Sequence, residues 1–179
     1  MRAASAGLLL MACVQTGALC AQDQHATWTL AVDPATARPG GKVLVKMTGT
    51  IEPGWHLYSM STPAANPTKV AVTGPAVDKV RSLQAPFQRS FDANFNSDTE
   101  FYEGTAVFLF EVTLKPDATP GPSEMVLAAR YQTCNPKQCV PSKWTGTASV
   151  TIAADAPAST PAIPANFTEP APAARSSLR

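Results

Sequence analysis

The sequence predicts an all-β fold, an immunoglobulin-like antiparallel β-sandwich. Apolar and polar residues alternate in several short segments, as they do in strands that have one buried face. Turns containing proline and glycine separate these segments, and no stretch shows a helical period of useful length. Roughly seven to nine short strands within about 130 residues are typical of a sandwich built on a single hydrophobic core.

Turn residues mark the ends of the expected strands. Asp33-Pro34 ends the first strand and Pro53-Gly54 follows the second, because proline and glycine favour turns. The most regular alternation lies in residues 105–114, where one face carries Ala106, Phe108, Phe110 and Val112. The full set of expected strands is residues 27–32, 42–51, 55–58, 69–73, 77–83, 105–114, 125–133 and 144–152.

Residues 1–21 are predicted to be a secretory signal peptide. Arg2 supplies a short positive start, an apolar run follows, and Ala18-Leu19-Cys20 places small residues at a cleavage site. The apolar run is too short to span a membrane. Lipoprotein processing at Cys13 is the less favoured alternative, because Met11 fits a lipobox poorly. Either route exports the chain to an oxidising compartment in which disulfides persist.

Residues 22–154 are expected to form the single folded domain, and residues 155–179 a separate tail. Alternating alanine and proline in this tail cannot form a strand ladder or a core, so we expect it to be extended and disordered. It could be a linker to a further domain or a solvated end, and we favour the solvated end. The formal charge of +1 gives no electrostatic reason to expect binding to nucleic acid or to an anionic membrane.

Cys134 and Cys139 are the only cysteines outside the predicted signal peptide. Asn135 and Pro136 suit the first two positions of a turn, so a hairpin loop would set the cysteines opposite each other within disulfide range. The bond would close a small loop and add only about 2 kcal/mol of stability through chain entropy. It would also cross a hairpin that the sheet already defines. Spacing alone therefore leaves two interpretations open, a redox-active pair and a local structural staple.

Three motifs, through their residues, order and spacing, resemble one known family. The strongest is Tyr131-Gln132-Thr133-Cys134 followed by Cys139-Val140-Pro141. The others are Pro53–Ser59, which contains Gly-Trp-His-Leu-Tyr-Ser, and Phe91–Phe95, which is followed by Tyr102-Glu103-Gly104. Over residues 28–152 the chain resembles the N-terminal periplasmic domain of the thiol:disulfide interchange protein DsbD.

The resemblance implies an immunoglobulin-like domain in the periplasm that acts as a protein-disulfide reductase. The implied partners are thioredoxin-like periplasmic oxidoreductases, such as disulfide isomerases and those of cytochrome c maturation, and the implied electron donor is a separate membrane protein. By position, Cys139 resembles the cysteine that bonds to the partner, and Cys134 resembles its resolving mate. Phe95 resembles the aromatic residue of a cap loop over the cysteines, and Asp92 and Asn94 lie beside it.

Further candidate site residues adjoin these motifs. Tyr131, Gln132, Pro141 and His56 are expected near the cysteine pair, although a histidine at a strand end is more often a packing or hydrogen-bonding group. Two distant histidines and two close cysteines do not make a zinc site, so no metal is expected, and the exchange chemistry needs no cofactor. We expect a monomer. The competing hypothesis is a secreted scaffold or adhesion module whose disulfide is inert.

Overall fold

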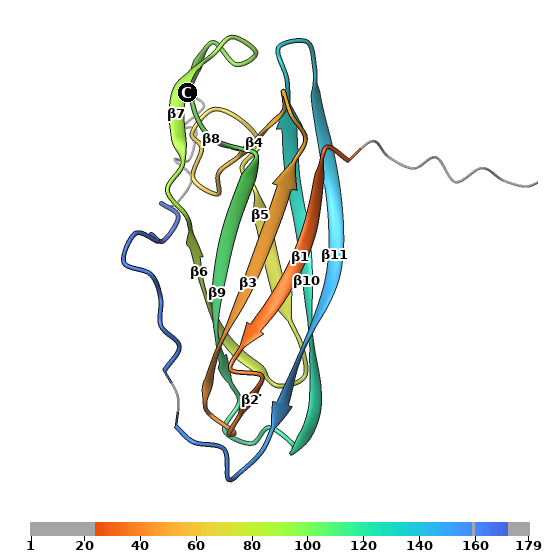
Figure 1. The fold of residues 1–179 in the computed structure, drawn as a ribbon, viewed down its shortest axis with the longest axis vertical. Helices are drawn as coiled ribbons and strands as arrows, with labels where there is room; N and C mark the ends of the chain where they lie inside the picture. Colours follow the sequence, from red (N-terminus) through yellow and green to blue (C-terminus); the bar gives the residue numbers. More distant parts are fainter. Residues whose placement is uncertain (1–23, 159, 172–179) are drawn as a thin grey trace, which may run out of the picture.

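A computed structural model of the chain describes residues 24–158 and 160–171, which form two packed β-sheets (Figure 1). No helix in this part of the chain is long and apolar enough to cross a membrane. The predicted signal peptide and the alternative lipidation site at Cys13 lie outside the described residues. The immunoglobulin-like sandwich that the sequence predicts is confirmed.

One sheet has four strands and the other has seven. The four-stranded sheet has the order β1 (Ala26–Asp33), β3 (Lys42–Ile51), β9 (Thr105–Leu114) and β6 (Val77–Gln84). The seven-stranded sheet has the order β2 (Thr36–Ala37), β11 (Cys139–Ile152), β10 (Gly121–Cys134), β4 (His56–Tyr58), β8 (Ser97–Glu103) and β7 (Gln88–Asp92), with β5 (Lys69–Thr73) also paired to β10. All pairings are antiparallel except that of β2 with β11, which is parallel.

Each strand expected from the sequence is present, and three further strands are found. The two-residue β2 is too short to show a pattern. In β7 and β8, apolar and polar residues do not alternate regularly, so the sequence does not indicate strands there. The first four residues of β7 are all exposed, and Phe91 among them is 61% exposed. Strands β10 and β11 also run further than predicted, so that their pairing reaches the two cysteines.

The main core lies between the two sheets. Val43, Val45 and Met47 of β3 are fully buried there. At the β1 edge of this core, Trp28 packs edge-on against Tyr131, with ring centroids 5.1 Å apart. The predicted apolar face of β9 also lies in this core, and its members are Ala106, Phe108, Phe110 and Val112.

Residues 160–171, the C-terminal segment, pack against the outer face of the four-stranded sheet, which differs from the disordered tail expected there. Residues 159 and 172–179 of the predicted tail lie outside the described residues. The C-terminal segment runs beside β6 in Figure 1, and Thr168 exchanges two backbone hydrogen bonds with Gln84, at 2.9 and 3.0 Å. The prediction of disorder rested on the proline-rich composition and did not consider two apolar residues, Ile163 and Phe167, which cover part of the sheet. They pack on a small second cluster made of Leu44, Leu83 and Leu109.

Candidate functional site

The hairpin between β10 and β11 ends in the cysteine pair. Cys134 and Cys139 are directly paired across the hairpin and bonded, with an S–S distance of 2.06 Å and a Cα–Cα distance of 4.1 Å. Asn135 donates its backbone N–H to the carbonyl of Gln138 at 2.9 Å. Its side-chain Oδ1 accepts from the backbone N–H groups of Lys137 and Gln138, at 2.8 and 2.9 Å. The predicted hairpin and disulfide are therefore present.

The disulfide lies on the outer face of the seven-stranded sheet. Side chains alternate along β10, so Tyr131 points into the core against Trp28, whereas Gln132 and Cys134 point outward. Pro141 is paired with Gln132 on this same outer face, and it is tolerated because β11 is an edge strand at that point. The structure thus brings Gln132 and Pro141 beside the disulfide but places Tyr131 on the opposite face of the sheet.

The two sulfur-bearing residues differ in access to solvent. Cys134 is fully buried, whereas Cys139 is half-buried. Gln132 donates its side-chain amide to the Sγ of Cys134 at 3.2 Å and is itself held by an amide hydrogen bond from Asn66. A second molecule can therefore approach the pair more easily from the side of Cys139.

A polar network lies next to Cys134. The turn at Pro53-Gly54, where Gly54 has a φ of +81°, leads into β4 and sets His56 opposite Cys134. The hydroxyl of Tyr58 donates to Asp92 Oδ2 at 2.6 Å. His56 Nε2 lies 3.1 Å from the Tyr58 hydroxyl and 3.5 Å from Asp92 Oδ2. The side chains of His56 and Asp92 are only 19% and 7% exposed, so the network is largely shielded from water.

Burial and hydrogen bonding set the charges in this network. Burial lowers the pKa of His56, against the opposing effects of Asp92 and Glu103. Burial alone would raise the pKa of Asp92, but the hydrogen bonds from Tyr58 and from the backbone of Asn94, together with His56, lower it overall. Burial and Asp92 raise the pKa of Tyr58. At neutral pH the network therefore holds an ionised Asp92, a protonated Tyr58 and a neutral His56.

The loop of the β7–β8 hairpin, which contains the predicted cap residues, is anchored to the same network. Asn94 donates its backbone N–H to Asp92 Oδ1 at 2.8 Å, and Phe95 donates its own to the Asp92 carbonyl at 3.2 Å. The ring of Phe95 packs edge-on against Tyr58, with centroids 5.7 Å apart. A hollow of about 350 Å³ lies between this loop and the turn at Asn135, and residues of both line it.

Two residues of this site escaped the sequence reasoning. Tyr58 follows His56 by two positions on the same strand face, and that spacing was a signal that could have found it. Asn66 comes from the irregular segment between β4 and β5, where no pattern points to it. In the described part of the chain, no three histidine, cysteine or acidic side chains gather closely enough to hold a metal ion.

Two solved structures are similar to this chain at low sequence identity. The N-terminal periplasmic domain of ScsB from Proteus mirabilis is 17% identical, with a TM-score of 0.54, over 70% of this chain and 46% of that chain. This chain thus spans about half the length of that protein. The N-terminal domain of DsbD from Neisseria meningitidis, in the reduced form, is 15% identical, with a TM-score of 0.39, over 64% of this chain and 78% of that one. Among curated protein sequences, none matches.

The family comparison is more specific. Residues 26–150, well over half of the chain, match the family described as "Thiol:disulfide interchange protein DsbD, N-terminal". This match includes both cysteines and the polar network beside them, and together with the Cys134–Cys139 bond it supports thiol–disulfide exchange as the chemistry of the site. The chain belongs to the family of DsbD N-terminal domains.

Proposed function

We propose that the protein is a periplasmic thiol–disulfide exchange protein that passes electrons through Cys134 and Cys139 to thioredoxin-like partners. The observation that carries this proposal is the unequal access of the two sulfurs. Cys139 is half-buried at the tip of a hairpin, whereas Cys134 is fully buried beside it. An accessible attacking thiol and a shielded resolving thiol are what stepwise exchange with a protein disulfide requires.

The exchange proceeds in two displacements. In the reduced protein, the Cys139 thiolate attacks one sulfur of the partner disulfide, and the other partner sulfur leaves as a thiolate and takes up a proton. The Cys134 thiolate then attacks the Cys139 sulfur of this mixed disulfide, and the second partner sulfur leaves and is protonated. Two electrons pass to the partner, and the Cys134–Cys139 bond re-forms. A separate membrane protein supplies two electrons to restore the dithiol, and no cofactor takes part.

The β7–β8 loop acts as a cap in this proposal. Phe95 packs on Tyr58, and Asp92 anchors the loop through its own side chain and carbonyl. A reduced dithiol in an oxidising compartment needs protection from small oxidants, and in this proposal the Phe95 ring limits access to the sulfurs from the side of Tyr58. The hollow between the loop and the turn at Asn135 gives the loop room to shift when a partner arrives.

Single-cysteine variants test the order of the two displacements. Cys134→Ser should accumulate a mixed disulfide with a thioredoxin-like periplasmic oxidoreductase, because the resolving thiol is missing. Cys139→Ser should form no such adduct and should not reduce the partner. Non-reducing electrophoresis and mass spectrometry of the adduct provide the measurement, with the double serine variant as the control.

Two outcomes would contradict the proposal. If Cys139→Ser reduces the partner as fast as the unmodified protein, Cys139 is not the attacking residue. If neither single variant forms an adduct and the unmodified disulfide resists thiol reductants, the scaffold with an inert disulfide becomes the better account.

A further inference from the structure

Three basic side chains lie in one row across the outer face of the seven-stranded sheet. Arg130 of β10 is directly paired with Lys69 of β5 on one side and with Lys143 of β11 on the other. All three side chains are exposed. Like charges at directly paired positions repel each other and destabilise a sheet. This basic row therefore has a cost to folding that the fold itself does not explain.

No acidic side chain among the described residues neutralises these three cations through an ion pair. None of the three forms an ion pair there. By contrast, Lys42 on the other sheet lies 2.8 Å from a Glu111 carboxylate oxygen. The positive charge of the basic row is thus available to a group from another molecule.

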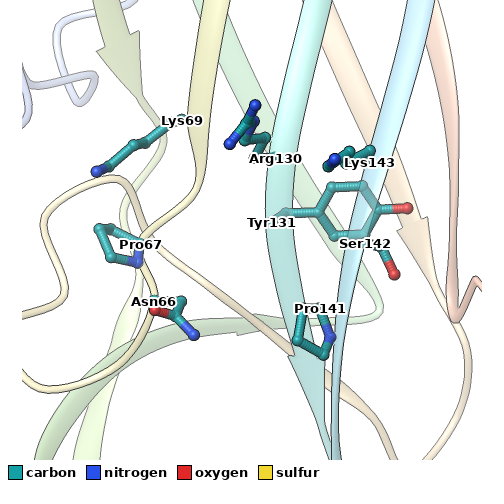
Figure 2. A pocket seen from close by; sticks show the side chains of 8 residues that line it. All are labelled: Asn66, Pro67, Lys69, Arg130, Tyr131, Pro141, Ser142 and Lys143. Atoms are coloured by element: carbon teal, nitrogen blue, oxygen red, sulfur yellow. The ribbon is translucent and has the colours of Figure 1, made fainter.

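A hollow of about 360 Å³ opens in front of the basic row. Figure 2 shows Lys69, Pro67 and Asn66 on one side of it, Pro141 and Lys143 on the other, and Arg130 between them. Pro141 follows Cys139 by two residues on the same face, a separation of about 7 Å along a strand. The hollow therefore begins next to the sulfur through which exchange is proposed to occur.

We propose that the basic row docks an acidic segment of the thioredoxin-like partner and so directs the partner's disulfide toward Cys139. This inference rests on the proposed function and names the chemistry of the surface that the partner presents. The row crosses three adjacent strands, so its ends are roughly 10 Å apart, which suits carboxylates spaced along a peptide better than one small anion. Arg130 can take a carboxylate through two parallel hydrogen bonds, and the lysines supply point charges on either side of it.

Binding of cysteine-free peptides to the oxidised protein tests the docking apart from any exchange. Three fluorescent peptides of equal length, rich in glutamate, glutamine or lysine, are compared by fluorescence anisotropy at low ionic strength. The glutamate peptide should bind at least about tenfold more tightly than the glutamine peptide, and about 0.5 M salt should remove most of this preference. The charge-neutralised variant K69Q/R130Q/K143Q should lose the preference, whereas the control variant R38Q/K46Q/K79Q should keep it.

Four results would contradict the proposed docking of an acidic segment. An unchanged preference in the charge-neutralised variant would overturn it, as would equal affinity for all three peptides. Inorganic phosphate that competes as well as the glutamate peptide would assign the row to a small anion instead. The charge-neutralised variant should also unfold at the same or a higher temperature at low salt, because it removes repulsion. A lower unfolding temperature would show that the row stabilises the sheet, which would contradict the repulsion inferred among its three cations.

Exchange kinetics separate this inference from the function on which it rests. The reduced protein is mixed with the same three peptides, each now carrying one disulfide. Exchange with the glutamine peptide reports on the proposed function, and the ratio of the glutamate rate to the glutamine rate reports on the basic row. We expect a ratio of about ten that falls to about one in the charge-neutralised variant. A ratio of one in the unmodified protein, with exchange intact, would overturn the docking alone.

Discussion

Part of the outer face of the four-stranded sheet is covered by the chain's own C-terminal segment, whereas the outer face of the seven-stranded sheet carries the disulfide and three exposed cations. On the first face, Phe167 and Ile163 bury a cluster around Leu109. On the second face, Lys69, Arg130 and Lys143 are exposed, and a hollow lies in front of Arg130. An apolar face is stabilised when another segment covers it, whereas charged side chains are stable in contact with water.

The second face also contains the more costly local structure. Asp92 is ionised although it is nearly buried, and Tyr58 and His56 are arranged around it. Burying a charge is unfavourable unless hydrogen bonds offset the loss of water. On the four-stranded sheet, the nearly buried carboxylate of Glu111 is instead paired directly with Lys42, at 2.8 Å. We infer from this difference that the covered part of one face contributes to stability, whereas the other face serves the proposed exchange.

Truncation of Leu109 is the most severe test of the covered face. Leu109→Ala should lower the free energy of unfolding by about 2–4 kcal/mol, because the side chain is buried between the sheet and Phe167. Urea denaturation measures the change. Val126→Ala on the outer face of β10, where Val126 is 37% exposed, is the control, and its cost should stay below about 1 kcal/mol. Equal costs for the two variants would show that the C-terminal segment does not cover Leu109 in solution.

Removal of one hydroxyl tests the buried network on the other face. Tyr58→Phe takes away the 2.6 Å hydrogen bond to Asp92 and leaves that carboxylate poorly solvated. The free energy of unfolding should fall by about 1–3 kcal/mol. Tyr102→Phe is the matched control, because its hydroxyl donates to a backbone carbonyl and no charged group loses a hydrogen bond. The control should lower the free energy of unfolding by less. A cost for Tyr58→Phe no greater than that of the control would contradict the assignment of an ionised Asp92.

Acid should weaken the fold in two stages. The pKa of folded His56 lies below its ordinary value of 6.5, so the unfolded chain binds a proton more readily, and stability falls as the pH drops below that value. The pKa of folded Asp92 lies below its ordinary value of 3.8, so its contribution is present above that pH and is lost as the pH falls through the folded pKa. His56→Gln should flatten the first stage and Asp92→Asn the second, as measured by denaturation across the pH range. A profile that neither variant changes would show that these groups do not govern the acid response.

Phe95 should have a small effect on stability and a larger effect on access. In the reduced protein, Phe95→Ala should raise the rate at which a small oxidant forms the Cys134–Cys139 bond, because the ring no longer limits entry past Tyr58. Stopped-flow measurement with diamide reports this rate. Phe91→Ala removes a ring that is already 61% exposed on the adjoining strand, and it serves as the control. Equal rates for both variants and the unmodified protein would count against the cap.

The sequence contained most of the framework and only part of the site. Alternation predicted the long strands and the buried face of β9, and turn chemistry predicted the cysteine hairpin. It did not predict β7, whose side chains are mostly exposed, and so it could not bring Asp92 to Tyr58, 34 residues away. The proline-rich composition also predicted a disordered tail, although Phe167 within it packs on the sheet. Contacts of this kind depend on which strands become neighbours, and no local pattern records that choice.

The basic row shows the same limit. Lys69, Arg130 and Lys143 are unremarkable as separate residues in the sequence, because each reads as a solvated charge. Strand register alone sets them side by side, through the pairing of β10 with β5 and β11. The local motif around Cys134 was visible in the sequence, whereas the surface that adjoins it required the sheet.

The reduction potential of the Cys134–Cys139 bond tests the central claim most directly. Thiol alkylation after equilibration in graded redox buffers gives the fraction of reduced protein at each potential. A working exchange pair should have a value between about −180 and −280 mV, within the range of known exchange proteins. A value well below about −300 mV would mean that the bond is built to persist, and the inert scaffold would then be the correct account.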